Sequence, residues 1–169
     1  QWQPGGNLSD PATLFGSMYR RILAVGGAKA ILWIQGETDA SNGNSTATYQ
    51  SQLNTFIDTV YTNQGIRTVV AQIGNRYGGA TSANADKIRL AQKNIWATNT
   101  NAIQGPTLYD IPTDDGVHYS TDEALTKVGD RFWAAISKYF YGGTDGTGPQ
   151  LSSATYDSAR TTILLNFTD

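Results

Sequence analysis

The sequence predicts an α/β fold, in which helices cover both faces of a parallel β-sheet. Two short apolar runs, at residues 30–34 and 68–73, alternate with longer stretches whose apolar residues recur at helical spacing. The first run is too short for a helix and has glycines on both sides, which is typical of a strand buried on both faces. Because strands and helices alternate, we expect a parallel sheet with its reactive groups at the carboxyl ends of the strands.

Four amphipathic helices are expected to cover this sheet. Pro11 favours the first position of a helix, with Ser9 or Asp10 as the cap, and the glycines at 26–27 end it. The spacing of apolar residues places the other three helices at about 49–64, 88–96 and 121–141. The last begins at a capping-box sequence with Ser120 as the expected cap, after a short third strand at 107–111.

The chain divides into one domain and a short appended segment. Residues 1–141 contain the alternation of strands and helices and form the predicted α/β domain. Residues 142–149 are rich in Gly, Thr and Asp, which indicates a linker. Residues 150–169 contain a strand-like run with no helix after it, so we expect them to start a β-rich module.

Composition excludes several classes of function. The formal charge is −2 and the 12 Lys and Arg residues are scattered, so no nucleic-acid surface is expected. No apolar run reaches the ~18–20 residues of a membrane span. With one histidine and no cysteine, no metal or other cofactor is expected. Glycosylation sequons at Asn7, Asn44 and Asn166 favour an extracellular location, or the surface of a cell or virion.

The single histidine, His118, follows Asp115 by three residues. A neutral imidazole can take and return a proton near pH 7, and a nearby carboxylate can fix its tautomer. Residues 114–116, Asp-Asp-Gly, could instead form an ordinary surface turn with His118 beside it. Proton-transfer chemistry, if the chain performs any, is expected at His118.

A second polar stretch follows the first predicted strand. Gln35 and Glu37 stand where this buried strand ends, and Gly36 allows the backbone to turn. Polar groups at such a place cost folding free energy, so they indicate a function. We interpret Asp39 as an ordinary loop carboxylate, and one of the two acidic residues could pair with Arg89.

Together these stretches resemble blocks III and V of the SGNH (GDSL-like) hydrolases. Residues 33–39 and 115–118 are most similar to the sialate O-acetylesterase-like and acetylxylan-esterase-like carbohydrate esterases. Further pieces fit in the same order, at 2–5, 14–18, 88–92 and 128–131. The resemblance covers about residues 1–141 and implies a flavodoxin-like, three-layer parallel sheet.

The resemblance also implies a serine esterase that removes O-acetyl groups from an acetylated oligo- or polysaccharide. His118 would be its general base and Asp115 the carboxylate that orients the imidazole. The side-chain amide of Gln35 would donate a hydrogen bond to the oxyanion, an interaction worth roughly 3–4 kcal/mol in the transition state.

Five further residues receive weaker assignments. Gly36, Glu37 and Arg89 are expected to support the loop that carries Gln35. Tyr77 and Tyr119 are candidate stacking surfaces for a sugar ring, or else ordinary surface tyrosines.

The nucleophilic serine implied by the resemblance has no counterpart in this sequence. The Gly-x-Ser block and the glycine block after it are missing, Ser17 lies inside a predicted helix, and Ser120 is expected as a helix cap. We therefore expect the fold to be incomplete at its N-terminus and the chain alone to be inactive. The serine would lie on an upstream segment or a separate chain, in a strand beside residues 30–34.

Two other functions remain open. The chain could be a non-catalytic carbohydrate-binding or structural module on the same scaffold, but such a module has no need of Gln35, Asp115 and His118 together. A glycosidase using Glu37 and Asp115 as paired carboxylates would leave His118 idle. The esterase is therefore the preferred function.

Overall fold

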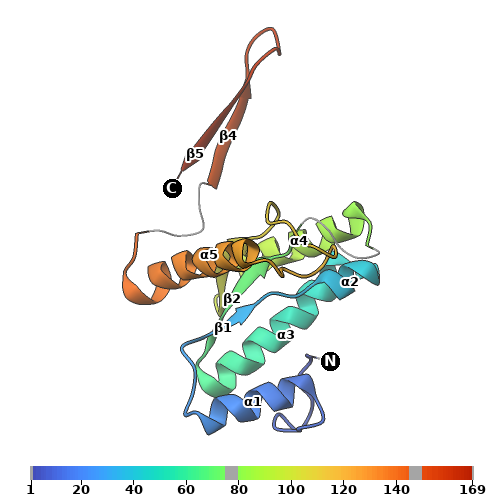
Figure 1. Ribbon diagram of the computed structural model, residues 1–169, viewed down its shortest axis with the longest axis vertical. Helices are drawn as coiled ribbons and strands as arrows, with labels where there is room; N and C mark the ends of the chain where they lie inside the picture. Colours follow the sequence, from blue (N-terminus) through green and yellow to red (C-terminus); the bar gives the residue numbers. More distant parts are fainter. Residues whose placement is uncertain (1, 75–79, 145–149, 169) are drawn as a thin grey trace.

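The structure is a computed structural model that describes residues 2–74, 80–144 and 150–168. Its main body is a three-stranded parallel sheet in the order β1 (Ala30–Trp33), β2 (Arg67–Gln72), β3 (Ala102–Thr107). Helices cover both faces, so the predicted α/β class is confirmed (Figure 1). They are α1 (Leu14–Ala24), α2 (Glu37–Ser41), α3 (Thr46–Gln64), α4 (Ser82–Thr98) and α5 (Asp122–Tyr141).

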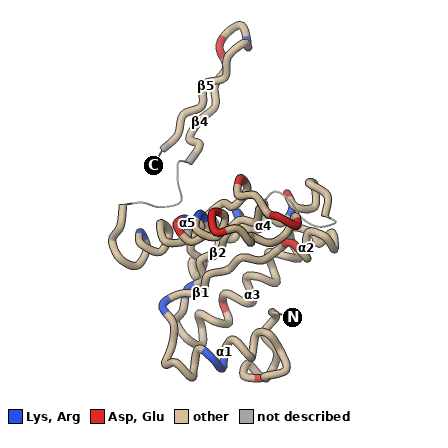
Figure 2. The backbone as a smooth tube through the Cα atoms, in the orientation of Figure 1, with Lys and Arg blue, Asp and Glu red and all other residues tan. Residues whose placement is uncertain are grey.

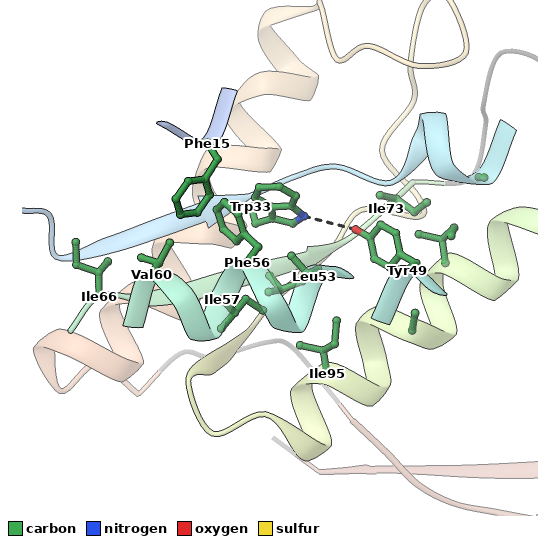
Figure 3. Close-up of a cluster of buried hydrophobic side chains, with 14 of the residues drawn as sticks. Phe15, Trp33, Tyr49, Leu53, Phe56, Ile57, Val60, Ile66, Ile73 and Ile95 are labelled. Atoms are coloured by element: carbon green, nitrogen blue, oxygen red, sulfur yellow. Dashed lines mark hydrogen bonds between the residues drawn. The ribbon is translucent and has the colours of Figure 1, made fainter. Parts of the chain in front are cut away.

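Side chains alternate across the sheet and build two cores. On one face, Trp33 and Val70 pack with residues of α1, α3 and α4. The ring of Phe56 in α3 lies 4.5 Å from that of Trp33 and 5.6 Å from that of Phe15, measured between centroids (Figure 3). On the other face, Val69 of β2 packs in the cluster that α5 covers. The sheet is thus the middle of three layers.

Two predicted helix caps are wrong. Helix α1 begins at Leu14, and its cap is Thr13, whose Oγ1 accepts a hydrogen bond from Gly16 N. The Asp10 carboxylate is used three residues earlier, where it accepts from Ala12 N at 2.9 Å and forms a turn. At α5 the cap is Thr121, and Ser120 instead donates to Asp114. In both cases several adjacent residues could cap, and sequence alone does not rank them.

The third strand lies earlier than predicted. Strand β3 ends at Thr107, and Leu108 continues into a turn while its N–H still donates to Gln72 O at 3.0 Å. The sequence of β3 includes Gly105 and Pro106, which disfavour strands and hid it from the pattern. A Cβ at Gly105 would lie 2.5 Å from Val70 O, so the close approach of the two strands requires glycine there.

Strand β1 is an edge strand, and one of its faces is open. Within the described residues it pairs on one side only, with β2. Leu32 is 50% exposed and Ile34 39% exposed, so burial on both faces was a wrong prediction for this chain. The reason is that α5 packs over β2 and β3, which leaves the same face of β1 uncovered.

The C-terminal segment forms an antiparallel hairpin of β4 (Gln150–Tyr156) and β5 (Ile163–Thr168), which stands apart from the α/β body in Figure 1. The carboxylate of Asp157 accepts Thr161 N at 2.7 Å and closes the turn. The strand-like run near the end of the sequence is thus a strand. The division into domain, linker and β-rich module stays a prediction. No helix in the described part of the chain has the length and apolarity to cross a membrane.

Gly36 combines a positive φ with close packing, and we expect Gly36→Ala to destabilise the fold by about 2–3 kcal/mol. Its φ is +149°, and an added Cβ would lie 2.7 Å from Ile88 Cγ2 and 3.3 Å from Gln92 Nε2. Strain and overpacking therefore add. Chemical denaturation measures the free energy of unfolding.

Gly65→Ala is the matched control. Gly65 has a φ of +65° at the end of α3, but an added Cβ would meet nothing within 4 Å. We expect a loss of only about 1 kcal/mol there. Equal losses in the two variants would contradict the role of crowding at Gly36.

Candidate active site

Asp115 and His118 form a hydrogen-bonded pair in the loop after β3. His118 Nδ1 lies 2.6 Å from Asp115 Oδ2. The other carboxylate oxygen accepts the backbone N–H groups of Val117 at 2.8 Å and His118 at 2.7 Å. Gly116, with a φ of +85°, makes this tight turn possible. The surface turn and the Asp115–His118 pair are thus the same structure, because the turn places the carboxylate against the imidazole.

This pairing changes the proton affinity of both groups. The hydrogen bond from His118 and those from the backbone hold the Asp115 pKa well below its usual range. The hydrogen bond to Asp115 raises the His118 pKa, and the charges of Asp115 and Glu37 add to the effect. Since a carboxylate accepts at Nδ1, the neutral ring carries its proton there and leaves Nε2 as an acceptor. No described residue hydrogen-bonds to Nε2, and the His118 side chain is 76% exposed.

The backbone of Gln35 is held by a buried hydrogen-bond network. Its carbonyl oxygen accepts from the Tyr49 hydroxyl at 2.6 Å and from Gln92 Nε2 at 3.0 Å. Gln92 Oε1 in turn accepts Ile73 N at 3.0 Å, just after β2. Figure 3 shows Tyr49 pointing from α3 towards Trp33. Burial raises the Tyr49 pKa far above its usual value, so this hydroxyl stays protonated.

The side chain of Gln35 is oriented by Asp39. Gln35 Nε2 donates to Asp39 Oδ2 at 2.6 Å, and Asn44 Nδ2 donates to Asp39 Oδ1 at 2.6 Å. Interpreting Asp39 as an ordinary loop carboxylate was therefore wrong. A primary amide has two N–H groups, so one remains for another acceptor. The four-residue separation of Gln35 and Asp39, at the start of a helix, was the signal available in the sequence.

Glu37 is the first residue of α2 and is half-buried. Burial raises its pKa, while the backbone N–H groups of Glu37 and Gly36 and the charge of His118 act in the opposite direction. Glu37 and His118 therefore lie close enough to influence each other, although 81 residues separate them in the sequence. The structure thus brings the loop after β1 and the loop after β3 together at the carboxyl ends of the strands.

Arg89 fixes the end of β2 from α4. It donates to Gly74 O at 2.8 Å, pairs with Asp86, and places its guanidinium carbon 4.9 Å from the centre of the Tyr109 ring. Its side chain is 12% exposed. These contacts support the loops around the site, and the predicted pairing of Glu37 with Arg89 stays a prediction.

Of the two tyrosines predicted to stack on a sugar, Tyr119 is described by the structure. Tyr119 is half-buried and packs against the core under α5, and its hydroxyl would meet a Cβ at Gly74 at 2.7 Å. Tyr77 lies outside the described residues. Within residues 2–74, 80–144 and 150–168, no group of three or more His, Cys, Asp or Glu residues is placed to hold a metal ion.

Comparisons with known proteins bear on the family and the fold of this chain. The family model described as "Carbohydrate esterase, sialic acid-specific acetylesterase" matches residues 1–138. A solved structure of an Arabidopsis thaliana protein is similar, with a TM-score of 0.59 and 24% identity. The similarity covers 80% of this chain and 58% of the plant protein, so this chain spans less than two thirds of it. No curated protein matches the chain.

The plant structure supports the fold, and the family model covers most of the sequence. The three-layer arrangement with a parallel sheet is that of the SGNH-like hydrolases. This chain belongs to the family of carbohydrate esterases described as sialic acid-specific acetylesterases.

Proposed function

We propose that this chain provides the base and the oxyanion donor of an esterase that removes O-acetyl groups from a glycan. The observation that carries the proposal is the Asp115–His118 pair, whose Nε2 is open to a substrate or nucleophile. The family of the chain supports acetyl-ester hydrolysis. We also propose that the protein is extracellular or lies at the surface of a cell or virion, where a glycan substrate would be available.

In the proposed reaction, His118 Nε2 takes the proton of a serine hydroxyl as its oxygen attacks the acetyl carbonyl carbon. Asp115 stabilises the imidazolium that forms. The free N–H of the Gln35 amide donates to the oxyanion of the tetrahedral intermediate. His118 then returns the proton to the departing sugar oxygen, and water, activated by the same base, releases acetate from the serine.

The serine is proposed to come from a further strand beside β1, on an upstream segment or a separate chain. Such a strand would pair with the open edge of β1, and its side chains would pack beside Leu32 and Ile34, which are half exposed. If it ran parallel to β1, its carboxyl end would lie next to Gln35. Ser17 is not suited to the role, because it lies within α1 on the sheet face opposite α5.

A non-catalytic carbohydrate-binding or structural module remains the second candidate. The observation that favours it is the 76% exposure of the His118 side chain, with no described serine hydrogen-bonded to it. This function needs neither a nucleophilic serine nor a further strand at the open edge of β1.

Labelling with a fluorophosphonate probe distinguishes the two candidates. We expect the full-length protein to label at a serine outside residues 1–169, as located by mass spectrometry after digestion, and the isolated chain to remain unlabelled. Label at Ser17 or Ser120 of the isolated chain would overturn the proposed position of the nucleophile. A full-length protein that takes no label and hydrolyses no acetyl ester would favour the non-catalytic module.

The titration of His118 tests the proposed base directly, since it gives the only histidine signals in the NMR spectrum of this chain. We expect a pKa above the ordinary 6.5. In Asp115→Asn the pKa should fall, because the hydrogen bond to a carboxylate and its charge are lost. Asp114→Asn is the control, since Asp114 bonds to Ser120. A pKa unchanged by Asp115→Asn would contradict the pairing.

The raised pKa of His118 determines how esterase activity and stability each change with pH. The proposed base must be neutral, so esterase activity should rise with pH through the raised His118 pKa. Stability depends on pH in the opposite sense: the favourable pairing is fully present below the unfolded pKa and is lost as pH rises through the folded pKa. The activity limb of Asp115→Asn should therefore move to lower pH, at a lower maximal rate.

Gln35→Ala should lower kcat of the full-length protein by about 10²–10³-fold, the usual loss for one oxyanion donor. Asp39→Ala should lower kcat less, since the amide remains but loses its fixed orientation. Gln50→Ala is a matched control, because Gln50 lies on another surface of α3, where it accepts a hydrogen bond from Asn94 of α4. Loss of activity in the control, or none in Gln35→Ala, would contradict the assigned donor.

A further inference from the structure

A groove of about 410 Å³ lies between the N-terminal segment, α2 and α3, and Gln35 forms part of its wall. Its size is within the usual range of small-molecule sites. We propose that this groove binds an uncharged sugar ring of the glycan, next to the sugar that carries the acetyl group. The proposal rests on the proposed function for the position of the reacting group.

An aromatic surface lines one part of the groove. Trp2 is 37% exposed, and its indole packs edge-to-face on Trp33 and Phe56, with centroids 5.5 Å and 6.4 Å away. These contacts hold the ring in place while part of it faces the groove. A pyranose ring has an apolar face of C–H groups, which packs well on an immobilised aromatic ring.

Amide and hydroxyl side chains line the rest of the groove. An amide both donates and accepts hydrogen bonds, as a sugar hydroxyl does, so the two match in either direction. Gln3 is already held by a hydrogen bond to Gln52 O at 3.1 Å, and Asn44 by its bond to Asp39. Thr38 and Asn42, which are exposed, complete this polar part. Hydroxyl groups on one ring therefore find several fixed partners.

The charge of the groove selects against acidic sugars. Asp39 is the only charged side chain among the described residues that line it. Glu37 precedes it by two residues, so α2 carries two acidic residues and no basic one; Figure 2 marks acidic positions in red. A carboxylate or phosphate on the ligand would meet negative charge and no described cation in the groove, which costs affinity. An uncharged ring meets no such repulsion.

Because Gln35 is shared, the groove and the reaction site adjoin each other. The Gln35 amide is the proposed oxyanion donor, and Asp39 both orients that amide and lines the groove. A ring bound on Trp2 would thus hold the glycan with its neighbouring residue at the reacting carbonyl. This is the positioning by which remote binding energy accelerates a reaction.

The test is binding of xylotetraose, an uncharged probe without acetyl groups, to the full-length protein, monitored by NMR shifts and tryptophan fluorescence. We expect saturable binding that weakens by about tenfold in Trp2→Ala. Trp133→Ala is the control, since Trp133 is 59% exposed on α5 and should leave binding unchanged. Asn42→Ala, at an exposed position, should also weaken binding and keeps the test valid if Trp2→Ala fails to fold.

His118→Ala separates this proposal from the proposed function, because it should abolish hydrolysis in the full-length protein and leave xylotetraose binding intact. No saturable binding, or binding unaffected by both Trp2→Ala and Asn42→Ala, overturns the groove. Tighter binding of N-acetylneuraminic acid than of xylotetraose overturns its preference for uncharged rings.

Discussion

The hydrogen bonds on the Gln35 carbonyl are the constraint on which the rest of the site depends. Tyr49 from α3 and Gln92 from α4 both donate to this oxygen, and Gln92 also accepts from Ile73 after β2. Leaving one such buried group without a partner costs roughly 1–3 kcal/mol. Two helices and two strands are therefore fixed at the one residue whose side chain is the proposed oxyanion donor, and crowding around Gly36 keeps the backbone there from moving.

The other half of the site is built in a different way. Asp115 and His118 are exposed, and their arrangement comes from four consecutive residues, since Asp115 accepts two backbone N–H groups and the imidazole of the same turn. This turn can form with little help from the core. The proposed base therefore depends on local geometry, whereas the proposed donor at Gln35 depends on packing between distant elements, and a destabilised core would affect the donor first.

These two origins explain what could be predicted from sequence. The Asp115–His118 pair was predictable because its signal is local, and the parallel sheet was predictable from alternating patterns. Tyr49 and Gln92 could not be recognised, because each looks like an ordinary residue of an amphipathic helix until α3 and α4 are placed beside β1. Burial of β1 on both faces was predicted wrongly for a related reason. An apolar run indicates that a strand favours burial, but it does not show whether another element of the described chain covers the strand.

The open edge of β1 bears on the proposed position of the nucleophile. An exposed edge strand with apolar side chains is a site of aggregation unless another element covers it, and natural sheets avoid such edges with charges, proline or bulges. Leu32 and Ile34 have none of these protections, and β1 pairs regularly along its full length with β2. A parallel strand added at this edge would pair with the open backbone N–H and C=O groups of β1, and its carboxyl end would lie next to Gln35. The proposed upstream strand would therefore meet two requirements at once, because it would pair with β1 and would carry the proposed serine.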